Sequence, residues 1–223
     1  VAASLGYPDG ERIPAAERLA AVGRIAQAVE VPVSADLEAG YGDPVATARA
    51  AVDAGVAGLN LEDKAGSADE HVERIRAVRA EVGDELVVNA RIDVFLHGTG
   101  GVEDAVERGN AYLDAGADCV FPIGVSEGAA IARLAAGIDG PVNVLAGAGT
   151  PPIGELEAMG VARVTFGSGL TRAAYGAAVR GATEALEDGT YGWLESATPW
   201  PELSRLLEGF ATMNAASRGG AAR

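Results

Sequence analysis

One pattern constrains the fold of this chain more than any other: an amphipathic helical run, a turn of small residues and a short apolar strand recur along it. The pattern is found at residues 21–36, 50–63, 111–124, 131–147 and 154–169. A further apolar run, LVVNARID, follows a charged helical segment. Strands that alternate with helices at this spacing pair in parallel, and continuous apolar strands are typical of parallel sheets. We therefore predict an α/β protein with a parallel sheet.

Glycines separate most of the helical runs from the strands that follow: Gly55, Gly116, Gly140 and Gly160. Glycine is common just beyond the C-terminus of a helix because it tolerates a positive φ. We expect each of these residues to end a helix in this way.

The number of strands favours a barrel. Six are predicted, at 31–36, 58–63, 86–93, 119–124, 141–147 and 163–169. A (β/α)8 TIM-type barrel has eight strands and about 250 residues, so we expect the first two strands, about 50 residues, to lie upstream of Val1. The competing fold is an open doubly wound sheet, but no G-x-G-x-x-G turn follows a strand. We predict a barrel domain over residues 1–185 and a helical tail over 186–223.

The charge balance excludes some functions. There are 32 acidic and 17 basic residues, a formal net charge of −15, whereas nucleic-acid binding needs a basic surface. No run reaches the roughly 20 apolar residues of a membrane span, and no basic and then apolar leader opens the chain. The single cysteine, Cys119, allows no internal disulfide. We expect a cytoplasmic protein with no nucleic-acid or membrane partner.

The residues available also restrict the metal. Only two histidines are present, so a zinc site built on histidines is not expected. A bound metal should be a hard, oxygen-liganded ion such as Mg²⁺ or Mn²⁺.

Charged residues stand at the ends of the first three predicted strands: Asp36 and Glu38, then Glu62 and Asp63, then Arg91 and Asp93. In a barrel these strand ends meet at one mouth, where active sites lie. Clustered carboxylates can hold a divalent cation, and an arginine can bind a substrate carboxylate through two hydrogen bonds. The alternative is that these acids are solvated or cap the following helices.

Four segments resemble the phosphoenolpyruvate mutase/isocitrate lyase superfamily. PVSADLEAGYGDP (32–44) is similar to its metal-binding stretch, and GLNLEDK (58–64) to its Glu-Asp-Lys motif. NARIDVF (89–95) resembles its Ala-Arg strand, and SLGYPDGE (4–11) the loop after its second strand. The resemblance extends over about residues 1–180.

The resemblance implies a role for each site residue. Asp36 would be the direct Mg²⁺ ligand, while Glu38, Glu62 and Asp9 would hold metal-bound waters. Substrate would bind to Arg91, Asn89, Gly40 and Tyr41, with Arg91 on a carboxylate. Arg91, Glu62 and Lys64 would be the catalytic residues, although an ion pair of Lys64 with Glu62 or Asp63 is an alternative.

These roles imply a Mg²⁺-dependent lyase or hydrolase that cleaves a C–C bond in a small 2-oxo or 2-hydroxy carboxylate through an enolate-like intermediate. The alternatives are a phosphonomutase or phosphonopyruvate hydrolase acting on a P–C bond, and a barrel that binds a carboxylate without turnover. Because the C-terminal helices of the family often exchange between subunits, we expect a homo-oligomer, a dimer or tetramer, with residues 186–223 at its interface.

One segment departs from the family. Isocitrate and methylisocitrate lyases carry a Lys-Lys-Cys-Gly-His loop after the Glu-Asp pair, and this chain has AGSADEH (65–71) there. Its only cysteine, Cys119, is on a later strand, where we expect a small core residue. Without that proton donor we predict negligible isocitrate or methylisocitrate lyase activity.

Overall fold

The computed structural model describes residues 1–208 and divides the chain into two compact units, Val1–Thr165 and Phe166–Arg223. Six strands lie in the described part of the first unit: β1 (Ser34–Asp36), β2 (Gly58–Glu62), β3 (Val87–Ile92), β4 (Cys119–Pro122), β5 (Asn143–Leu145) and β6 (Arg163–Thr165). Each falls within its predicted range but is shorter, because the residues at its end leave the ladder and enter loops. The residues from Phe166 onward, which we had predicted to extend the sixth strand, lead into a helix of the second unit.

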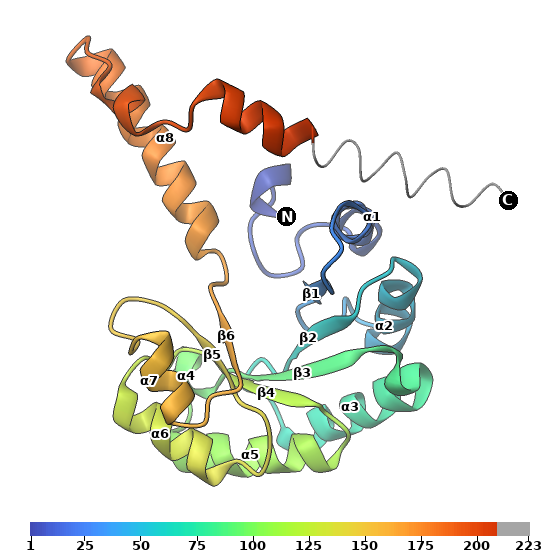
Figure 1. Cartoon of the computed structure of the whole chain (residues 1–223). Coiled ribbons are helices and arrows are strands. Elements are labelled where there is room, and N and C mark those ends of the chain that lie inside the picture. Colours follow the sequence, from blue (N-terminus) through green and yellow to red (C-terminus); the bar gives the residue numbers. More distant parts are fainter. Residues whose placement is uncertain (209–223) are drawn as a thin grey trace, which may run out of the picture. The chain divides into compact units, whose positions relative to one another are not determined.

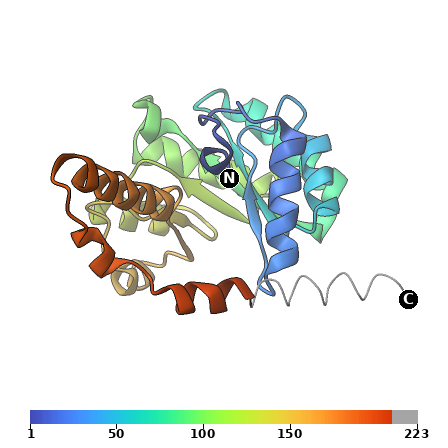
Figure 2. The ribbon, with the colours of Figure 1, turned by 90° about the horizontal axis from the view of Figure 1, so that it is seen from above.

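The helices of this unit are α1 (Ala15–Ala28), α2 (Pro44–Asp53), α3 (Ala68–Val82), α4 (Val94–His97), α5 (Val102–Asp114), α6 (Gly128–Gly137) and α7 (Ile153–Ala158), with short 3₁₀ turns η1 (Ala3–Leu5) and η2 (Gly83–Glu85). Helices α2, α3, α5 and α6 all run along one side of the strands (Figure 1). Seen from above, α1 lies alongside α2 and α3 (Figure 2).

The strands pair in chain order. Strands β1 to β4 form one parallel sheet and β5 and β6 another, and a parallel bridge between Val120 and Val142 links them. A doubly wound sheet reverses its strand order and carries helices on both faces. Sequential strands with helices on one side are instead the arrangement of a (β/α) barrel wall. The predicted parallel α/β architecture is confirmed.

The two faces of the strands differ in chemistry, because neighbouring residues of a strand point to opposite sides. One set of residues belongs to the hydrophobic core against the helices: Leu59, Leu61, Val88, Ala90, Ile92, Val120, Val142 and Val144. The alternate residues, on the opposite face, include the polar or charged Asn60, Glu62, Asn89, Arg91, Asn143 and Arg163. The face away from the helices therefore carries the chemistry.

Local sequence signals explain where the helices begin beside this chemistry. Asp43 caps α2 by accepting a hydrogen bond from the amide of Ala46, with Pro44 at the first helical position. Ser67 caps α3 through the amide of Glu70. Helix α3 therefore begins only six residues after Glu62, and the loop between β2 and α3 spans residues 63–67.

The turn glycines act in two ways. Gly55, Gly116 and Gly160 have the positive φ values expected beyond a helix. Gly140 does not, and our expectation for it was wrong. A Cβ atom at this position would lie 2.8 Å from a Cδ atom of Leu113, so glycine is required there by close packing against α5.

The second unit is helical in its described part. Helix α8 (Gly169–Glu187) is followed by Gly189 with a positive φ, the 3₁₀ helix η3 (Gly192–Ser196), and a helix from residue 200, directly after Pro199. Trp193 packs against Gly181 of α8, whereas Trp200 is exposed. The predicted boundary at residues 185 and 186 falls near the end of α8 and stays a prediction. No helix in residues 1–208 is long and apolar enough to cross a membrane.

Candidate active site

The charged strand ends of β1, β2 and β3 meet at one edge of the sheet. Glu62, the last residue of β2, is in register with Arg91 of β3, and Asp36, the last of β1, is in register with Asn60. Glu38 follows β1, and its carbonyl accepts a 2.8 Å hydrogen bond from the amide of Glu62. Parallel pairing thus brings together Asp36, Glu38, Glu62 and Arg91, as predicted from their positions in the sequence.

Glu38 is buried against an arginine from α1. The guanidinium of Arg18 donates to a carboxylate oxygen of Glu38 at 2.5 Å and to the carbonyl of Asp36 at 2.7 Å. Burial raises the pKa of Glu38, and the charge of Arg18 only partly opposes this effect. The amide of Glu38 donates to the carboxylate of Asp36 at 3.1 Å. Arg18 therefore sets the orientation of the turn that carries both acids.

Glu62 and Arg91 form a second ion pair, and Asp93 completes it. Arg91 donates through Nη1 to Glu62, through Nε to Asp93 at 2.6 Å and through Nη2 to Asp93 at 3.3 Å. Burial raises the pKa of Glu62 to about 7, with Arg91 opposing and the negative charge of Asp36 adding to the shift. Two carboxylates therefore hold the guanidinium of Arg91 in one orientation.

Residues near the N-terminus cover this edge. Glu11 accepts hydrogen bonds from the amide of Tyr41 at 2.8 Å and from the amine of Lys64 at 3.0 Å. Burial acts to raise the pKa of Glu11, but these contacts outweigh it, and the pKa is lowered. Asp9, on the same segment, acts on Glu38 through its charge. Lys64 thus pairs with Glu11 rather than with Glu62 or Asp63, and its catalytic role stays a prediction.

The loops around this edge are conformationally strained. Five non-glycine residues of the described chain have a positive φ, and all of them lie here: Glu11, Glu38, Tyr41, Lys64 and Ala65. Such backbone conformations cost free energy and cluster at functional sites. Their concentration marks the loops after β1 and β2, together with the segment that carries Glu11, as a site whose geometry is maintained against local preference.

The three other residues implied by the resemblance lie in different settings. Asn89 is fully buried two residues before Arg91 on the same face; its amide donates to Asn60 at 2.7 Å, and its own oxygen has no partner among residues 1–208. The hydroxyl of Tyr41 is also buried without a partner in the described part of the chain, and burial raises its pKa to about 12. Gly40 differs, because its amide and carbonyl both bond within its own turn. Asn89 and Tyr41 thus offer unused polar atoms, and Gly40 shapes the loop.

The donor set fits a hard divalent cation. Its donors are carboxylate oxygens, and the buried Tyr41 hydroxyl, which their charges influence, has no partner in the part of the chain that the structure describes. Among the described residues no three acidic, histidine or cysteine side chains come close enough to enclose an ion directly. The arrangement therefore suits one direct carboxylate ligand with the other carboxylates acting through waters, which is how Mg²⁺ is usually held.

Reasoning from the sequence missed Arg18 and Glu11. Arg18 is buried with Ala21 and Val22, three and four residues further along α1. A charged residue in register with the apolar face of a helix was therefore the available signal. Glu11 had none, because its partners Tyr41 and Lys64 lie 30 and 53 residues away.

Comparison with known proteins supports the family resemblance that the sequence motifs indicate. The family model for phosphoenolpyruvate phosphomutase matches residues 1–186. The 2,3-dimethylmalate lyase of Eubacterium barkeri is 36% identical over 183 residues, which cover 71% of this chain and 62% of that enzyme. This chain thus spans less than two thirds of the length of that lyase.

Solved structures show the same similarity. A crystal structure from Burkholderia cenocepacia J2315, named only as a candidate lyase or mutase, has a TM-score of 0.85 and 36% identity over 92% of this chain and 79% of that one. Oxaloacetate acetylhydrolase in complex with oxalate has a TM-score of 0.79 and 28% identity, over 99% and 82%. Phosphonopyruvate hydrolase in complex with oxalate and Mg²⁺ has a TM-score of 0.79 and 25% identity, over 97% and 82%. The predicted barrel-type fold is confirmed.

Proposed function

Because the chain belongs to the phosphoenolpyruvate phosphomutase family, we propose that it is a Mg²⁺-dependent lyase or hydrolase that cleaves a C–C bond in a small 2-oxo or 2-hydroxy carboxylate. The observation that carries this proposal is the ion pairing of Arg91 with Glu62 of β2 and with Asp93 after β3, at the edge of the sheet where the acids of β1 also lie. The negative charges of Asp36 and Glu38 act on the pKa of Glu62 in this ion pair, which supports placing the anion-binding and cation-binding groups in one site.

The contacts of each residue suggest its role in the proposed reaction. Arg91 would bind the substrate carboxylate through guanidinium N–H groups that Asp93 and Glu62 leave free. Asn89 and Tyr41 have unused polar atoms for the substrate or for ordered water. Arg18 holds Glu38 in place and offsets part of the negative charge of the cluster. All these groups are oriented by contacts within the protein before substrate binds, which favours catalysis.

Asp36, Glu38, Glu62 and Asp9 would hold the cation, with Asp36 as the direct ligand. Asp36 is exposed and forms no ion pair within the described residues, whereas Glu38 and Glu62 are each bound to an arginine. When bound, Mg²⁺ would act as a Lewis acid toward the negative charge that develops on substrate oxygens in an enolate-like intermediate.

Cleavage of a P–C bond is the second candidate. The loop between β2 and α3 offers no cysteine to protonate a carbon leaving group, and the Ser67 hydroxyl caps α3. Substrates whose leaving fragment is protonated by water, or needs no proton, therefore suit the site better. Oxaloacetate-like and phosphonopyruvate-like acids meet this condition, and both names occur among the structural neighbours.

A turnover assay tests the proposal. Isocitrate, methylisocitrate, oxaloacetate and phosphonopyruvate are supplied with Mg²⁺, and glyoxylate, pyruvate, oxalate and phosphate are measured, with and without a chelator. Arg91→Lys should lose activity, because lysine cannot form the same two-point contact. Arg133→Lys is the matched control, since Arg133 is an exposed arginine paired with Glu103 on the helices. Metal binding without turnover of any acid would favour the non-catalytic alternative.

We also propose that the protein is a homo-oligomer. Exposed large apolar side chains are frequent in the second unit: Leu170, Tyr175, Val179, Leu186, Tyr191, Leu194, Trp200, Leu206 and Leu207. Such surfaces commonly mark protein interfaces. Light scattering should give twice or four times the chain mass of 22.4 kDa, and a monomer would contradict this proposal.

A further inference from the structure

A buried aspartate beneath the site has all its hydrogen-bonding capacity occupied. Asp63 directly follows Glu62 and is 1% exposed. One carboxylate oxygen accepts from the amides of Ala65 at 2.8 Å and Asp93 at 3.0 Å. The other accepts from Arg108 at 2.9 Å and from the hydroxyl of Tyr112 at 2.8 Å. A carboxylate has about four acceptor positions, so Asp63 has none left for a metal ion or a substrate.

Two hydrogen bonds of Asp63 join the end of β2 to the end of β3. Its backbone amide donates to the carbonyl of Arg91 at 3.2 Å, and its side chain accepts from the amide of Asp93. Asp63 thus holds the backbone on both sides of Ile92. Since the Asp93 carboxylate binds the guanidinium of Arg91, any displacement of Asp93 is passed to Arg91.

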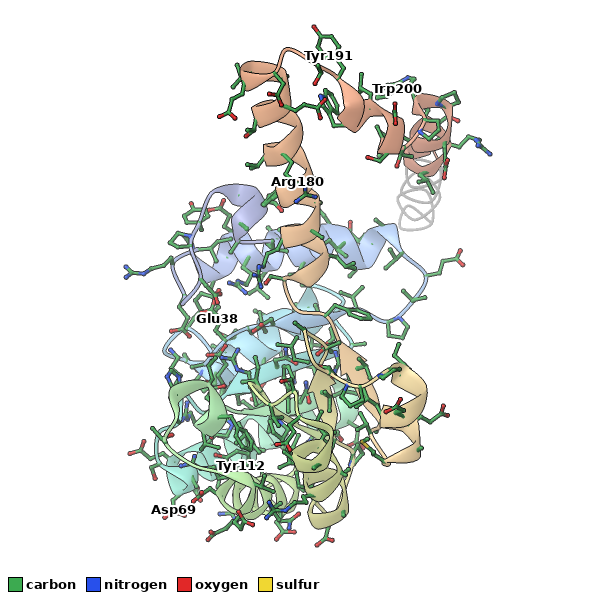
Figure 3. The ribbon with its side chains drawn as sticks, turned by 90° about the vertical axis from the view of Figure 1, so that its left-hand side faces the viewer. Glu38, Asp69, Tyr112, Arg180, Tyr191 and Trp200 are labelled. Atoms are coloured by element: carbon green, nitrogen blue, oxygen red, sulfur yellow. The ribbon has the colours of Figure 1, made fainter. Side chains whose placement is uncertain are left out.

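The other contacts connect Asp63 to the helices. Arg108 and Tyr112 are one turn apart on α5, and Arg108 also donates to the carbonyl of Gly66 at 2.9 Å. Tyr112 is fully buried among the helices, away from Glu38 (Figure 3), and its ring lies edge-on to His71 of α3 at 4.6 Å. This support also maintains the turn at Lys64 and Ala65, where two consecutive residues have a positive φ.

We propose that Asp63 is a positioning residue that sets the guanidinium of Arg91 relative to the carboxylate of Glu62. The contacts form a closed ring: Glu62 is bonded to Asp63, Asp63 binds the Asp93 amide, the Asp93 side chain binds Arg91, and Arg91 binds Glu62. The catalytic consequence rests on the proposed function, whereas the orientation of Arg91 does not.

Asp63→Asn tests this role with little change in side-chain shape. In either orientation the new amide nitrogen would face groups that cannot accept a hydrogen bond, either Arg108 or the amides of Ala65 and Asp93, so the contacts cannot all be retained and Asp63 loses its present position relative to Asp93. In the metal-free protein, we expect the Nε–H resonance of Arg91 to shift and to exchange faster with water. Turnover should fall by about 10- to 100-fold, the effect of displacing a catalytic group by up to about 1 Å. Tyr112→Phe, which removes one of the four contacts, should shift the same resonance less.

Asp118→Asn is the matched control. Asp118 also accepts from a strand amide, that of Val88 at 2.7 Å, and from an arginine, Arg79, but it does so at the other end of β3. The variant Asp118→Asn should lower the melting temperature of the protein without changing the Arg91 resonance or turnover.

A double variant separates positioning from stability. If Asp63 acts through Asp93, Asp63→Asn combined with Asp93→Asn should be no less active than Asp93→Asn alone. The proposal would be overturned if the losses of turnover in the two single variants multiplied in the double variant. An unchanged Arg91 resonance in folded Asp63→Asn would also overturn it. Absence of turnover in the unmodified protein would contradict the proposed function alone, because the resonance still tests the positioning of Arg91.

Discussion

The carboxylates of the site differ in how they are held. Glu38 and Glu62 are buried and bound to arginines, whereas the exposed carboxylate of Asp36 accepts one hydrogen bond, from the Glu38 amide. A carboxylate with free oxygen lone pairs and no cationic partner is the best available direct metal ligand. This distinction could not be read from the sequence, where all three are acids near a strand end.

Replacing Asp36 should therefore abolish metal binding. For Asp36→Ala we expect the affinity for Mg²⁺ to fall by at least about 100-fold, the upper range for removal of a residue that only supports a ligand, and activity to be lost with it. Calorimetric titration measures the affinity. Asp53→Asn, an exposed acid at the end of α2, is the control and should bind Mg²⁺ normally. Unchanged affinity in the Asp36 variant would remove it from the metal site.

The position of Gly40 leads to a prediction about the free energy of unfolding. It has a φ of +94°, and a Cβ atom there would lie 2.5 Å from the Cβ of Pro44. Gly42, in the same turn, has a φ of +81°, and no atom of the described chain lies within 4 Å of such a Cβ. Gly42→Ala should therefore lose only the roughly 1–2 kcal/mol of the left-handed conformation, and Gly40→Ala should lose more. Urea unfolding of both variants measures the difference, and equal losses would show that the turn relaxes around the added methyl group.

At the scale of the element, the loop between β2 and α3 is short and well bonded. The amide of Gly66 donates to the carbonyl of Asp63 at 2.9 Å, Asp63 accepts from Ala65, and Ser67 already caps α3. Residues 63–67, between Glu62 and α3, therefore contain no cysteine. Their one hydroxyl group, that of Ser67, is already used to cap α3.

This loop leads to a prediction about substrate. Cleavage of isocitrate or methylisocitrate leaves a carbanion equivalent that must be protonated, and serine is a poor acid near neutral pH. Activity with both acids should be negligible, while oxaloacetate or phosphonopyruvate is turned over. A coupled assay for glyoxylate or pyruvate checks this, and rapid isocitrate cleavage would contradict it.

At the scale of the whole molecule, one buried histidine links pH to stability. His71 is fully buried against Tyr112, and within the described residues neither ring nitrogen has a hydrogen-bond partner of good geometry. Burial, and then the charge of Arg74, lowers its pKa from 6.5 to about 4. The unfolded chain therefore binds a proton between these values and the folded protein does not. The contribution of His71 to the free energy of unfolding is therefore fully present above pH 6.5 and is lost as the pH falls toward 4.

The size of this effect can be measured by difference. The free energy of unfolding should fall by about 3 kcal/mol through His71 between pH 6.5 and 4. Glu62 acts in the opposite sense, since its pKa is raised and its stabilising protonation is lost as the pH rises toward 7. The comparison is therefore with His71→Leu, which should lack the His71 contribution. Exposed His97→Gln is the control, and equal pH dependence in His71→Leu would refute the assignment.

The sequence alone determined the architecture and most of the candidate site. Alternating helices and strands require parallel pairing, and parallel pairing places strand ends at one edge, so Asp36, Glu62 and Arg91 could be grouped from their positions alone. Local rules also located helix ends at Gly55, because φ preferences act on single residues.

Only the tertiary structure decided which partners these groups have. Asp63 and Asp93 were recognised as strand-end acids, but Asp63 supports the backbone while Asp93 orients Arg91, and nothing in their local sequence distinguishes the two roles. Arg18 meets Glu38 because α1 lies against the site, and Gly140 is required by Leu113 on α5. Such contacts join residues far apart in the chain, and their geometry exists only after the helices have packed on the strands.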